Sequence, residues 1–445
     1  MSGSRSNGRA SLGGAAISEH RLQNGLRVLL VERHADPVVA VITWYRVGAR
    51  NEREDEAGVS HFLEHMMFKG SRGYGKGEVD RITTELGGSN NAFTGYDHTA
   101  YWFELASDRW ERALEIEADR MRHLNLDPTE FDAEREVVLE ELAMGNDDPW
   151  RRLSQLAQAA LFMRHPYRRP IIGHADALRG MEVGGMRDYY RRFYHPGNAT
   201  LVVCGDIRPR RALAAVREHF AGIPAGPGYA EADCFRPVPA LPEGERRVSM
   251  TWPDRGSRLC MVWPGAAVGT DDDWTLDVVS TALTSGRTSR LYRELVLRTG
   301  LATSVSTHND SRVEGGVFWL LAECAQGVAP EKLEAAVDAQ LLELAAKRFP
   351  APELTHVKSV LTSAEAYESE TATDLAETLG EFAVDADWHQ AVEATTRLRA
   401  VTARQVQDCA QRLLLREHRV VGWCLPRQEV ATQSARRATA RRRHA

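Results

Sequence analysis

The segment His61-Phe62-Leu63-Glu64-His65 constrains this chain more than any other stretch of its sequence. On a helix, His61 and His65 lie one turn apart on the same face, because residues i and i+4 are helical neighbours. Two imidazoles placed in this way can both reach one metal ion, at Zn–N distances of about 2.0–2.1 Å. Glu64 precedes the second histidine, so its carboxylate can take a proton from a metal-bound water without being a ligand. The segment therefore predicts a helical metal site with a general base beside it.

The alternative is that these histidines simply belong to a protein surface or core. A pattern with three fixed positions also arises by chance, so it needs structural context. Here the neighbouring residues are apolar, and Phe62, Leu63 and Met66 predict a buried helix. Unpaired ionisable groups are costly in a core. A bound metal would give the two histidines and the glutamate a partner, and the context therefore favours the metal site.

A second helix, predicted over residues 127–144, offers a third ligand. Glu134, Val137, Val138 and Glu141 fall at i, i+3, i+4 and i+7, so they share one face of it. The two valines predict that this face is buried beside a partner. Zinc held by two histidines commonly takes a carboxylate as its third protein ligand. We expect Glu141 to fill that place, with Glu134 acting beside it on a ligand or on the substrate amine.

Length and composition narrow the class of protein. The chain has 445 residues, which predicts two or more domains. Its net charge of −6 argues against a nucleic-acid partner. No apolar run approaches the roughly 20 residues that span a bilayer, so we expect no membrane partner. The six cysteines are dispersed without a C-x-x-C pair, which indicates reduced thiols and a cytoplasmic location.

Changes in composition divide the chain into five parts. A Gly- and Pro-rich stretch that begins at Gly222 is the best boundary between two domains. The second half repeats the order of elements of the first, and Val202–Ile207 and Val420–Leu425 are expected to be equivalent strands. The predicted parts are a disordered tail (1–16), a catalytic zinc domain (17–221), a linker (222–245), a homologous C-terminal domain (246–428) and a basic disordered tail (429–445).

Strand signals surround the histidine segment. Leu26–Glu32 and Val38–Val47 are rich in β-branched residues, and we expect them to pair with each other. His98–Leu105 is aromatic and β-branched and is predicted to be a strand. Asn90–Gly95 is predicted to be a less regular strand or a sheet edge.

From about residue 17 to residue 426 the chain resembles the pitrilysin/insulysin family of zinc peptidases, and within it the shorter, processing-peptidase-like members. Six stretches between Leu22 and Ile207 carry this resemblance. They are L-Q-N-G-L-R-V, G-A-R-N-E, H-F-L-E-H-M-M-F-K-G, N-N-A-F-T-G-Y-D-H-T-A-Y, E-R-E-V-V-L-E-E and H-P-G-N-A-T-L-V-V-C-G-D-I. The H-x-x-E-H order in the third stretch is the inverzincin motif of metallopeptidases.

This resemblance implies an α+β fold with two homologous α/β domains. Each domain is expected to be a mostly antiparallel sheet packed with helices, and the two face each other across a cavity. In the family pattern the third ligand is the second of two carboxylates spaced seven residues apart, here Glu141, and the first, Glu134, is auxiliary. The resemblance also implies that a peptide lies as an added strand beside Asn91, Ala92 and Phe93, so that main-chain hydrogen bonds supply its affinity.

One departure from the family pattern concerns the second half. Members that are active alone carry there an Arg and, seven residues later, a Tyr that hold and polarise the scissile peptide. The equivalent positions here are Val296 and Thr303. Some relatives divide the zinc and the Arg/Tyr pair between two chains. We therefore expect a heterodimer with a homologous partner that supplies this pair, and a homodimer as the second choice.

The function expected from these residues is zinc-dependent hydrolysis of peptides or unfolded segments. One Zn²⁺ per chain is held by His61, His65 and Glu141, and Glu64 takes the proton of its water and passes it to the leaving amine. A non-catalytic scaffold subunit of the same family is the alternative, since the Arg/Tyr pair is missing. A metal-dependent hydrolase of another substrate class is a third reading, and Mn, Co or Fe also suit such ligands.

Overall fold

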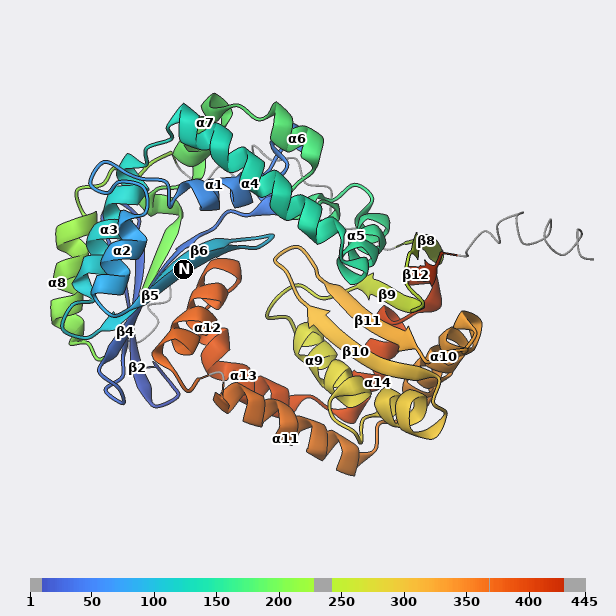
Figure 1. Ribbon diagram of the computed structural model, residues 1–445. Helices are drawn as coiled ribbons and strands as arrows, with labels where there is room; N and C mark the ends of the chain where they lie inside the picture. Colours follow the sequence, from blue (N-terminus) through green and yellow to red (C-terminus); the bar gives the residue numbers. More distant parts are fainter. Residues whose placement is uncertain (1–9, 228–241, 368, 428–445) are drawn as a thin grey trace, which may run out of the picture.

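The computed structural model describes residues 10–227, 242–367 and 369–427 of the chain. The first half builds a seven-stranded sheet in the spatial order β1-β2-β3-β7-β4-β6-β5 (Figure 1). Its strands are β1 (Ala10–Leu12), β2 (Ala15–Arg21), β3 (Arg27–Glu32), β4 (Val38–Tyr45), β5 (Ser89–Thr94), β6 (Thr99–Ala106) and β7 (Ala199–Gly205).

The second half builds a five-stranded sheet in the order β10-β11-β9-β12-β8. Its strands are β8 (Arg246–Trp252), β9 (Arg258–Pro264), β10 (Ala302–Asp310), β11 (Val317–Cys324) and β12 (Val420–Pro426).

The two sheets share one topology. The series β3-β7-β4-β6-β5 of the first sheet matches β8-β12-β9-β11-β10 of the second, in the same chain order. In both series the first strand runs parallel to its neighbour, the last strand of the series along the chain. All other neighbours in the series are antiparallel. The predicted fold of two homologous, mostly antiparallel α/β domains is confirmed, and β7 and β12 are equivalent strands.

The predicted pairing of Leu26–Glu32 with Val38–Val47 is wrong. β7 lies between β3 and β4, parallel to the former and antiparallel to the latter. Every residue of β7 is buried. A strand that is apolar on both faces fits the centre of a sheet covered on both sides. That place is filled by a segment far away in the sequence, which adjacency along the chain could not indicate.

The predicted disordered tail over residues 1–16 is also wrong in part. β1 pairs with β2 in a tight hairpin whose turn is Gly13-Gly14. Both glycines have positive φ, 55° and 79°, as a two-residue type I′ turn requires. The same glycines that indicated disorder are the residues that this turn needs. Residues 1–9 and 429–445, and residues 228–241 of the predicted linker, lie outside the described residues.

The described first half contains eight α-helices. They are α1 (Val59–Met66), α2 (Glu78–Glu85), α3 (Glu111–His123), α4 (Pro128–Asn146), α5 (Pro149–Phe162), α6 (Ala175–Gly180), α7 (Val183–Phe193) and α8 (Pro209–Phe220). α1, α3, α7 and α8 contribute to a large core on one face of the sheet. None of the helices in the described ranges is long and apolar enough to span a bilayer.

The second half contributes six α-helices and one π-helical segment to the described ranges. They are α9 (Asp271–Thr284), the π-helix Tyr292–Arg298, α10 (Pro330–Ala346), α11 (Ala351–Tyr367), α12 (Ala372–Asp385), α13 (His389–Ala400) and α14 (Ala403–Leu413).

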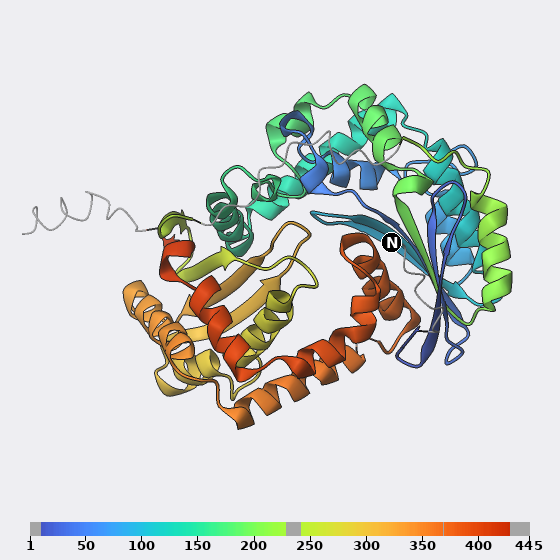
Figure 2. The ribbon, with the colours of Figure 1, turned by 180° about the vertical axis from the view of Figure 1, so that it is seen from behind.

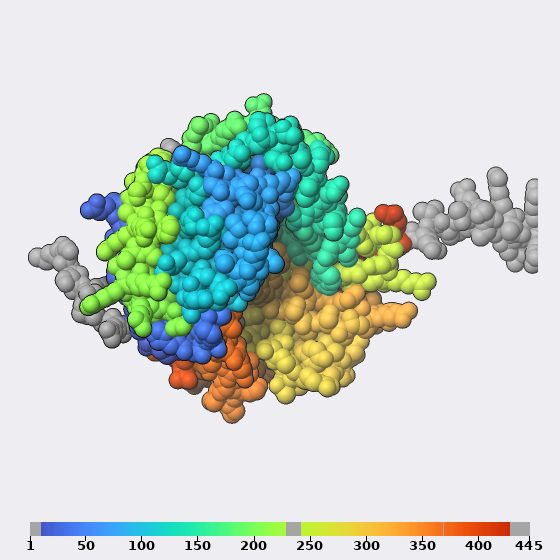
Figure 3. Space-filling view, turned by 60° about the vertical axis from the view of Figure 1, so that its left-hand side comes forward, coloured from blue at the N-terminus to red at the C-terminus, as the bar shows by residue number. Residues whose placement is uncertain are grey.

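Each half sends one helix to the sheet of the other half. Leu375 and Leu379 of α12 pack on the face of the first sheet that α1 leaves free, against Ile42 and Trp44. In return, Leu153 and its neighbours on α5 pack on the second sheet. The two views of the ribbon show α4 and α5 joining the lobes on one side and α11 to α13 joining them on the other (Figures 1 and 2). The surface is hollowed between the lobes (Figure 3).

The β5–β6 turn of the first sheet meets the β10–β11 turn of the second at a buried junction. The Asp97 carboxylate lies 2.8 Å from the Nε atom of Arg50, and both side chains are almost fully buried. The Tyr167 hydroxyl donates to Asp97 at 2.7 Å. The backbone N–H of Val313, in the second half, donates to the same carboxylate at 3.1 Å. Asp97 therefore ties together segments of both lobes.

Candidate metal centre

Helix α1 carries both histidines and is held at its N-terminus by a buried carboxylate. The two carboxylate oxygens of Glu52 accept hydrogen bonds from the backbone N–H groups of Gly58 and Ser60, each at 2.9 Å. These N–H groups have no partner inside the helix, so the carboxylate satisfies them. Burial raises the pKa of Glu52 to about 7, although the two backbone hydrogen bonds pull it down. The acidic run before the histidine segment thus fixes the start of α1.

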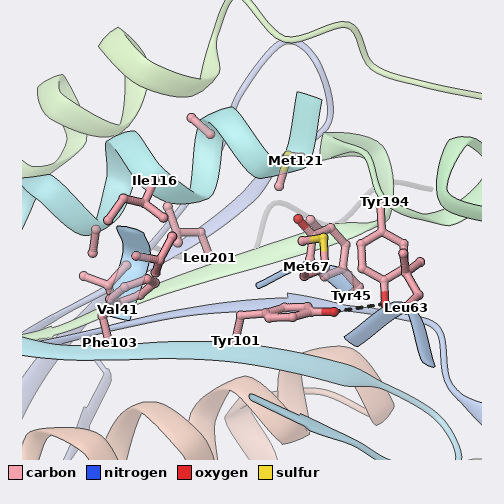
Figure 4. Close-up of a cluster of buried hydrophobic side chains, with 14 of the residues drawn as sticks. Val41, Tyr45, Leu63, Met67, Tyr101, Phe103, Ile116, Met121, Tyr194 and Leu201 are labelled. Carbon is pink, nitrogen blue, oxygen red and sulfur yellow. Dashed lines mark hydrogen bonds between the residues drawn. The ribbon is translucent and has the colours of Figure 1, made fainter. Parts of the chain in front are cut away.

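The apolar face of α1 fixes its rotation over the sheet. Leu63 and Met67 point into the core beside Tyr101 and Tyr194 (Figure 4). The ring of Phe62 stacks on Phe131 of α4, with centroids 4.6 Å apart. Because these side chains are buried, the opposite side of α1 presents its two histidines and its glutamate. The predicted buried helix is confirmed.

Three nitrogen and oxygen donors converge between α1 and α4. The Nε2 atoms of His61 and His65 lie 3.6 and 3.5 Å from the same oxygen, Oε2 of Glu141. One donor atom from each residue lies within 4.8 Å of the other two. Two donors that share a tetrahedral zinc ion at about 2.0–2.2 Å are themselves about 3.3–3.5 Å apart. The spacing therefore fits donors around a common ion better than hydrogen-bonded partners.

The protonation of His61 fits the same interpretation. Burial, followed by the neighbouring His65 and Arg151, lowers the pKa of His61 to about 4. The imidazole is thus neutral near pH 7, which is the form that binds metals. Its Nδ1 atom is buried and has no hydrogen-bond partner among the described residues.

Glu134 contacts a histidine rather than the open side of the site. Its Oε1 atom lies 2.9 Å from Nδ1 of His65, and its Oε2 atom lies 2.6 Å from Nζ of Lys69. Burial would raise the pKa of Glu134, but the hydrogen bonds from Lys69 and His65 outweigh it and lower the pKa. An ionised Glu134 favours a proton on Nδ1 of His65, which leaves Nε2 free to face Glu141. Glu134 was expected to act either on a metal ligand or on the substrate amine. Its contact with His65 supports a role in orienting that ligand.

Glu64 is placed beside the three donors without joining them. Its Oε2 atom accepts a short hydrogen bond from the hydroxyl of Thr94, at the end of β5. Burial raises the pKa of Glu64, and the Thr94 hydroxyl partly opposes that rise. A carboxylate in this position can exchange protons with a group bound at the donors.

The predicted substrate-binding residues lie on an open edge. Asn91, Ala92 and Phe93 belong to β5, which is the last strand of its sheet and pairs with β6 on one side. Within the described ranges no strand pairs with its other side. α1 packs directly against β5, so the open edge borders the helix that carries the histidines. The prediction of an edge strand here is confirmed.

One expectation about α4 is wrong. Val137 was expected to be buried with Val138, but it is 47% exposed. The buried stripe of α4 contains Phe131, Glu134, Val138 and Leu142 instead. Glu141 lies at the border of this stripe, with its side chain 41% exposed. The predicted ligand is thus accessible from solvent, as a site that takes substrate requires.

Sequence reasoning missed three residues around the site. Lys69 follows His65 by one helical turn, and that spacing could have indicated its contact with Glu134. Thr94 lies two residues beyond Ala92 on the predicted edge strand, so the side chains of both residues point to the same face of that strand. Glu52 was counted only as part of an acidic run. Its contacts depend on how the chain turns before α1, and no local pattern shows this.

The second-half positions that depart from the family pattern are also visible. Val296 lies in the π-helix and packs at the margin of the second core. Thr303 is exposed on β10, the edge strand of the second sheet that corresponds to β5. Neither side chain offers a cationic or phenolic group.

Comparison with known proteins decides the family. Residues 27–175 match the family model "Insulinase (Peptidase family M16)", and residues 183–361 match "Peptidase M16 inactive domain". An uncharacterized zinc protease of Mycobacterium bovis is 31% identical over 417 residues, covering 91% of this chain and 92% of the relative. The chain belongs to the M16 (insulinase) family of peptidases. The zinc protease PqqE of Helicobacter pylori is 29% identical to this M16 chain over 76% of either length.

Solved structures agree with the M16 assignment. A protease from Helicobacter pylori has a TM-score of 0.86 at 25% identity, covering 92% of this chain and 99% of that chain. The periplasmic protease PqqL of Escherichia coli has a TM-score of 0.76 at 20% identity. This M16 chain covers 47% of PqqL, so its fold corresponds to about half of that longer protein.

Proposed function

We propose that this M16 chain is a zinc-dependent endopeptidase subunit that hydrolyses peptides or unfolded segments. The observation that carries the proposal is the convergence of His61, His65 and Glu141 within 4.8 Å, beside the open edge of β5. The names of the curated relatives support zinc as the metal.

Each residue of the site has a distinct task in this proposal. The peptide backbone pairs with the free edge of β5 as an added strand, which accounts for affinity with little demand on sequence. A bound zinc ion would acidify its water and polarise the scissile carbonyl. Glu64 accepts the proton of the attacking water and returns it to the leaving amine nitrogen. Glu134 keeps the proton of His65 on Nδ1, and Thr94 orients Glu64.

We further propose that a homologous chain completes the site. Val296 and Thr303 supply neither the Arg nor the Tyr expected there, and one structural relative contains two such lengths in a single chain. A homodimer is the second choice. The chain alone is expected to be slow, and the double variant Val296→Arg, Thr303→Tyr should raise its kcat/KM. If the chain alone turns over as fast as it does with a companion chain from the native source, the partner proposal is wrong.

The direct test of the activity is the Glu64→Gln variant, with Glu140→Gln on the exposed side of α4 as its matched control. Zinc content is measured by elemental analysis, and cleavage is measured on unstructured peptides with and without the companion chain. Glu64→Gln should keep stoichiometric zinc and lose turnover, while the control should keep both. Normal cleavage by Glu64→Gln would overturn the assignment of the base.

A non-catalytic scaffold is the second candidate, because the expected Arg and Tyr are missing. A scaffold need not bind metal, so purified protein without stoichiometric zinc and without cleavage would favour it. For location, we propose a reducing, cytosol-like compartment. Five of the six cysteines are free and buried in the structure, and buried thiols fit such a compartment.

A further inference from the structure

Arg151, in the first turn of α5, lies beside the candidate metal centre. Its guanidinium covers Gly145 of α4 so closely that a Cβ atom built on that glycine would lie 2.6 Å from Cζ of Arg151. Gly145 follows Glu141 by one turn on the same side of the helix, which corresponds to roughly 6 Å along its axis. The absence of a side chain at Gly145 therefore lets the guanidinium of Arg151 lie against α4, one turn beyond Glu141.

Arg151 carries an uncompensated charge within the described part of the chain. Within residues 10–227, 242–367 and 369–427, no carboxylate or carbonyl pairs with its guanidinium, and the residue is exposed. Its cationic neighbours are neutralised: Arg168 lies 2.6 Å from Glu54, and Arg312 pairs with Asp310. The C-terminal end of α4 attracts a cation there. Most of the five N–H donors of an arginine are still free after such a contact.

Arg151 also lines a pocket of about 220 Å³ between the lobes. Gln155, one turn further along α5, borders the pocket with Tyr96 from the β5–β6 turn, and Trp319 of β11 borders it from the second half. Binding sites for drug-sized ligands have about 300–1,000 Å³, so this pocket suits a single amino-acid side chain or a chain end. The unpaired positive charge in this pocket belongs to Arg151, and Tyr96 and Trp319 give it partly aromatic walls.

We infer that Arg151 binds a carboxylate of the peptide substrate in this pocket, next to the bond that is cleaved. The inference rests on the proposed function, because it deepens the substrate choice of the same site. An arginine grips a carboxylate with two parallel hydrogen bonds, and such contacts are among the stronger polar contacts in proteins. The carboxylate comes either from an acidic side chain flanking the scissile bond or from the C-terminus of the peptide.

Matched peptides distinguish the two sources. One pair carries Glu or Gln beside the scissile bond, and a second pair ends in a free carboxylate or in an amide. The Arg151→Gln variant removes the charge and Arg151→Lys retains it. Arg164→Gln, an exposed arginine beyond the far end of α5, is the control for net charge. Cleavage is measured as kcat/KM, and affinity is measured by fluorescence anisotropy in the Glu64→Gln background, which does not depend on turnover.

The parent chain should prefer the acidic member of one pair by at least tenfold, and the pair that shows the preference identifies the source. Arg151→Gln should abolish the preference, Arg151→Lys should retain part of it, and Arg164→Gln should leave it intact. If the chain binds the acidic peptide of a pair more tightly but cleaves neither peptide, the role of Arg151 is supported and the proposed activity is wrong. Cleavage without discrimination, or cleavage with a preference that survives Arg151→Gln, would overturn the role of Arg151 and leave the proposed activity standing. Binding without discrimination and without cleavage would overturn both. Failure to bind any of the peptides would overturn both.

Discussion

The Nδ1 atom of His65 lies 2.9 Å from a carboxylate oxygen of Glu134, and this contact sets the orientation of the imidazole. It points the other ring nitrogen at Glu141, 3.5 Å away. Glu134 and Glu141 are two turns apart on one helix, so α4 contributes both a candidate ligand and the group that orients another. The geometry of α4 is therefore as important to the site as the histidine segment itself.

Glu134→Gln should weaken zinc binding by about 10- to 100-fold, which is the usual effect of losing a carboxylate behind a metal-binding histidine. The substitution removes the charge that holds the proton on Nδ1 of His65 and that pairs with Lys69. Zinc affinity is measured by competition with a chelator of known strength. Glu136→Gln, on the exposed side of α4, should bind zinc like the parent chain. Equal affinities for the two variants would show that Glu134 has no such role.

Thr94→Val should lower kcat/KM by about tenfold without loss of zinc, because Glu64 loses the hydroxyl that orients it. One ordinary hydrogen bond to a charged group contributes about 1.5–3 kcal/mol. Thr94→Ser restores the hydroxyl and should recover most of the activity. A defect that Ser does not rescue would point to packing of β5 rather than to Glu64.

Glu52 should make the stability of the fold depend on pH. Burial raises its pKa to about 7 in the native state, whereas an unfolded glutamate titrates near its ordinary value of about 4.3. The native state thus binds a proton that the unfolded chain has released between about pH 4.5 and 7. The stabilisation from this group is complete below that window and falls as the pH rises through it, by at most about 4 kcal/mol.

The Glu52→Gln variant isolates the contribution of Glu52 to the pH dependence of stability, because an amide does not titrate. The difference in free energy of unfolding between the parent and the variant is measured by urea denaturation at several pH values. Relative to the variant, the parent chain should lose free energy of unfolding as the pH rises from 4.5 to 7. A difference that stays constant over this range would mean that Glu52 has an ordinary pKa.

Asp97→Ala should destabilise the junction of the lobes by about 3–5 kcal/mol, which is the usual effect of removing one partner of a buried ion pair. It withdraws the carboxylate from Arg50, Tyr167 and the backbone of Val313 together. Denaturant unfolding measures the loss. Asp108→Ala, whose side chain is 69% exposed, should change stability by less than about 1 kcal/mol. Similar losses in both variants would contradict the role of the junction.

The site was more predictable from sequence than the packing around it. His61, His65, Glu134 and Glu141 were found from helical spacing alone, because a turn of helix places such residues together wherever the helix lies. The same helical spacing wrongly predicted that Val137 is buried. Its position next to Val138 on the helix does not decide which side of α4 meets the core.

Outside the candidate metal centre, contacts between distant segments could not be predicted. β7 enters the centre of the first sheet from far along the chain, and its composition fits any buried strand. The helices α5 and α12 cover each other's sheets, although each is amphipathic enough to cover its own. Arg151 has no sequence pattern of its own, since its place beside the metal centre depends on Gly145 and on the angle between α4 and α5.

The measurement that tests the central claim most directly is X-ray diffraction at the zinc absorption edge on crystals of the zinc-loaded chain. We predict a single anomalous peak about 2.0–2.2 Å from Nε2 of His61, Nε2 of His65 and a carboxylate oxygen of Glu141. No peak between α1 and α4, or a peak that Glu141 does not touch, would contradict the account.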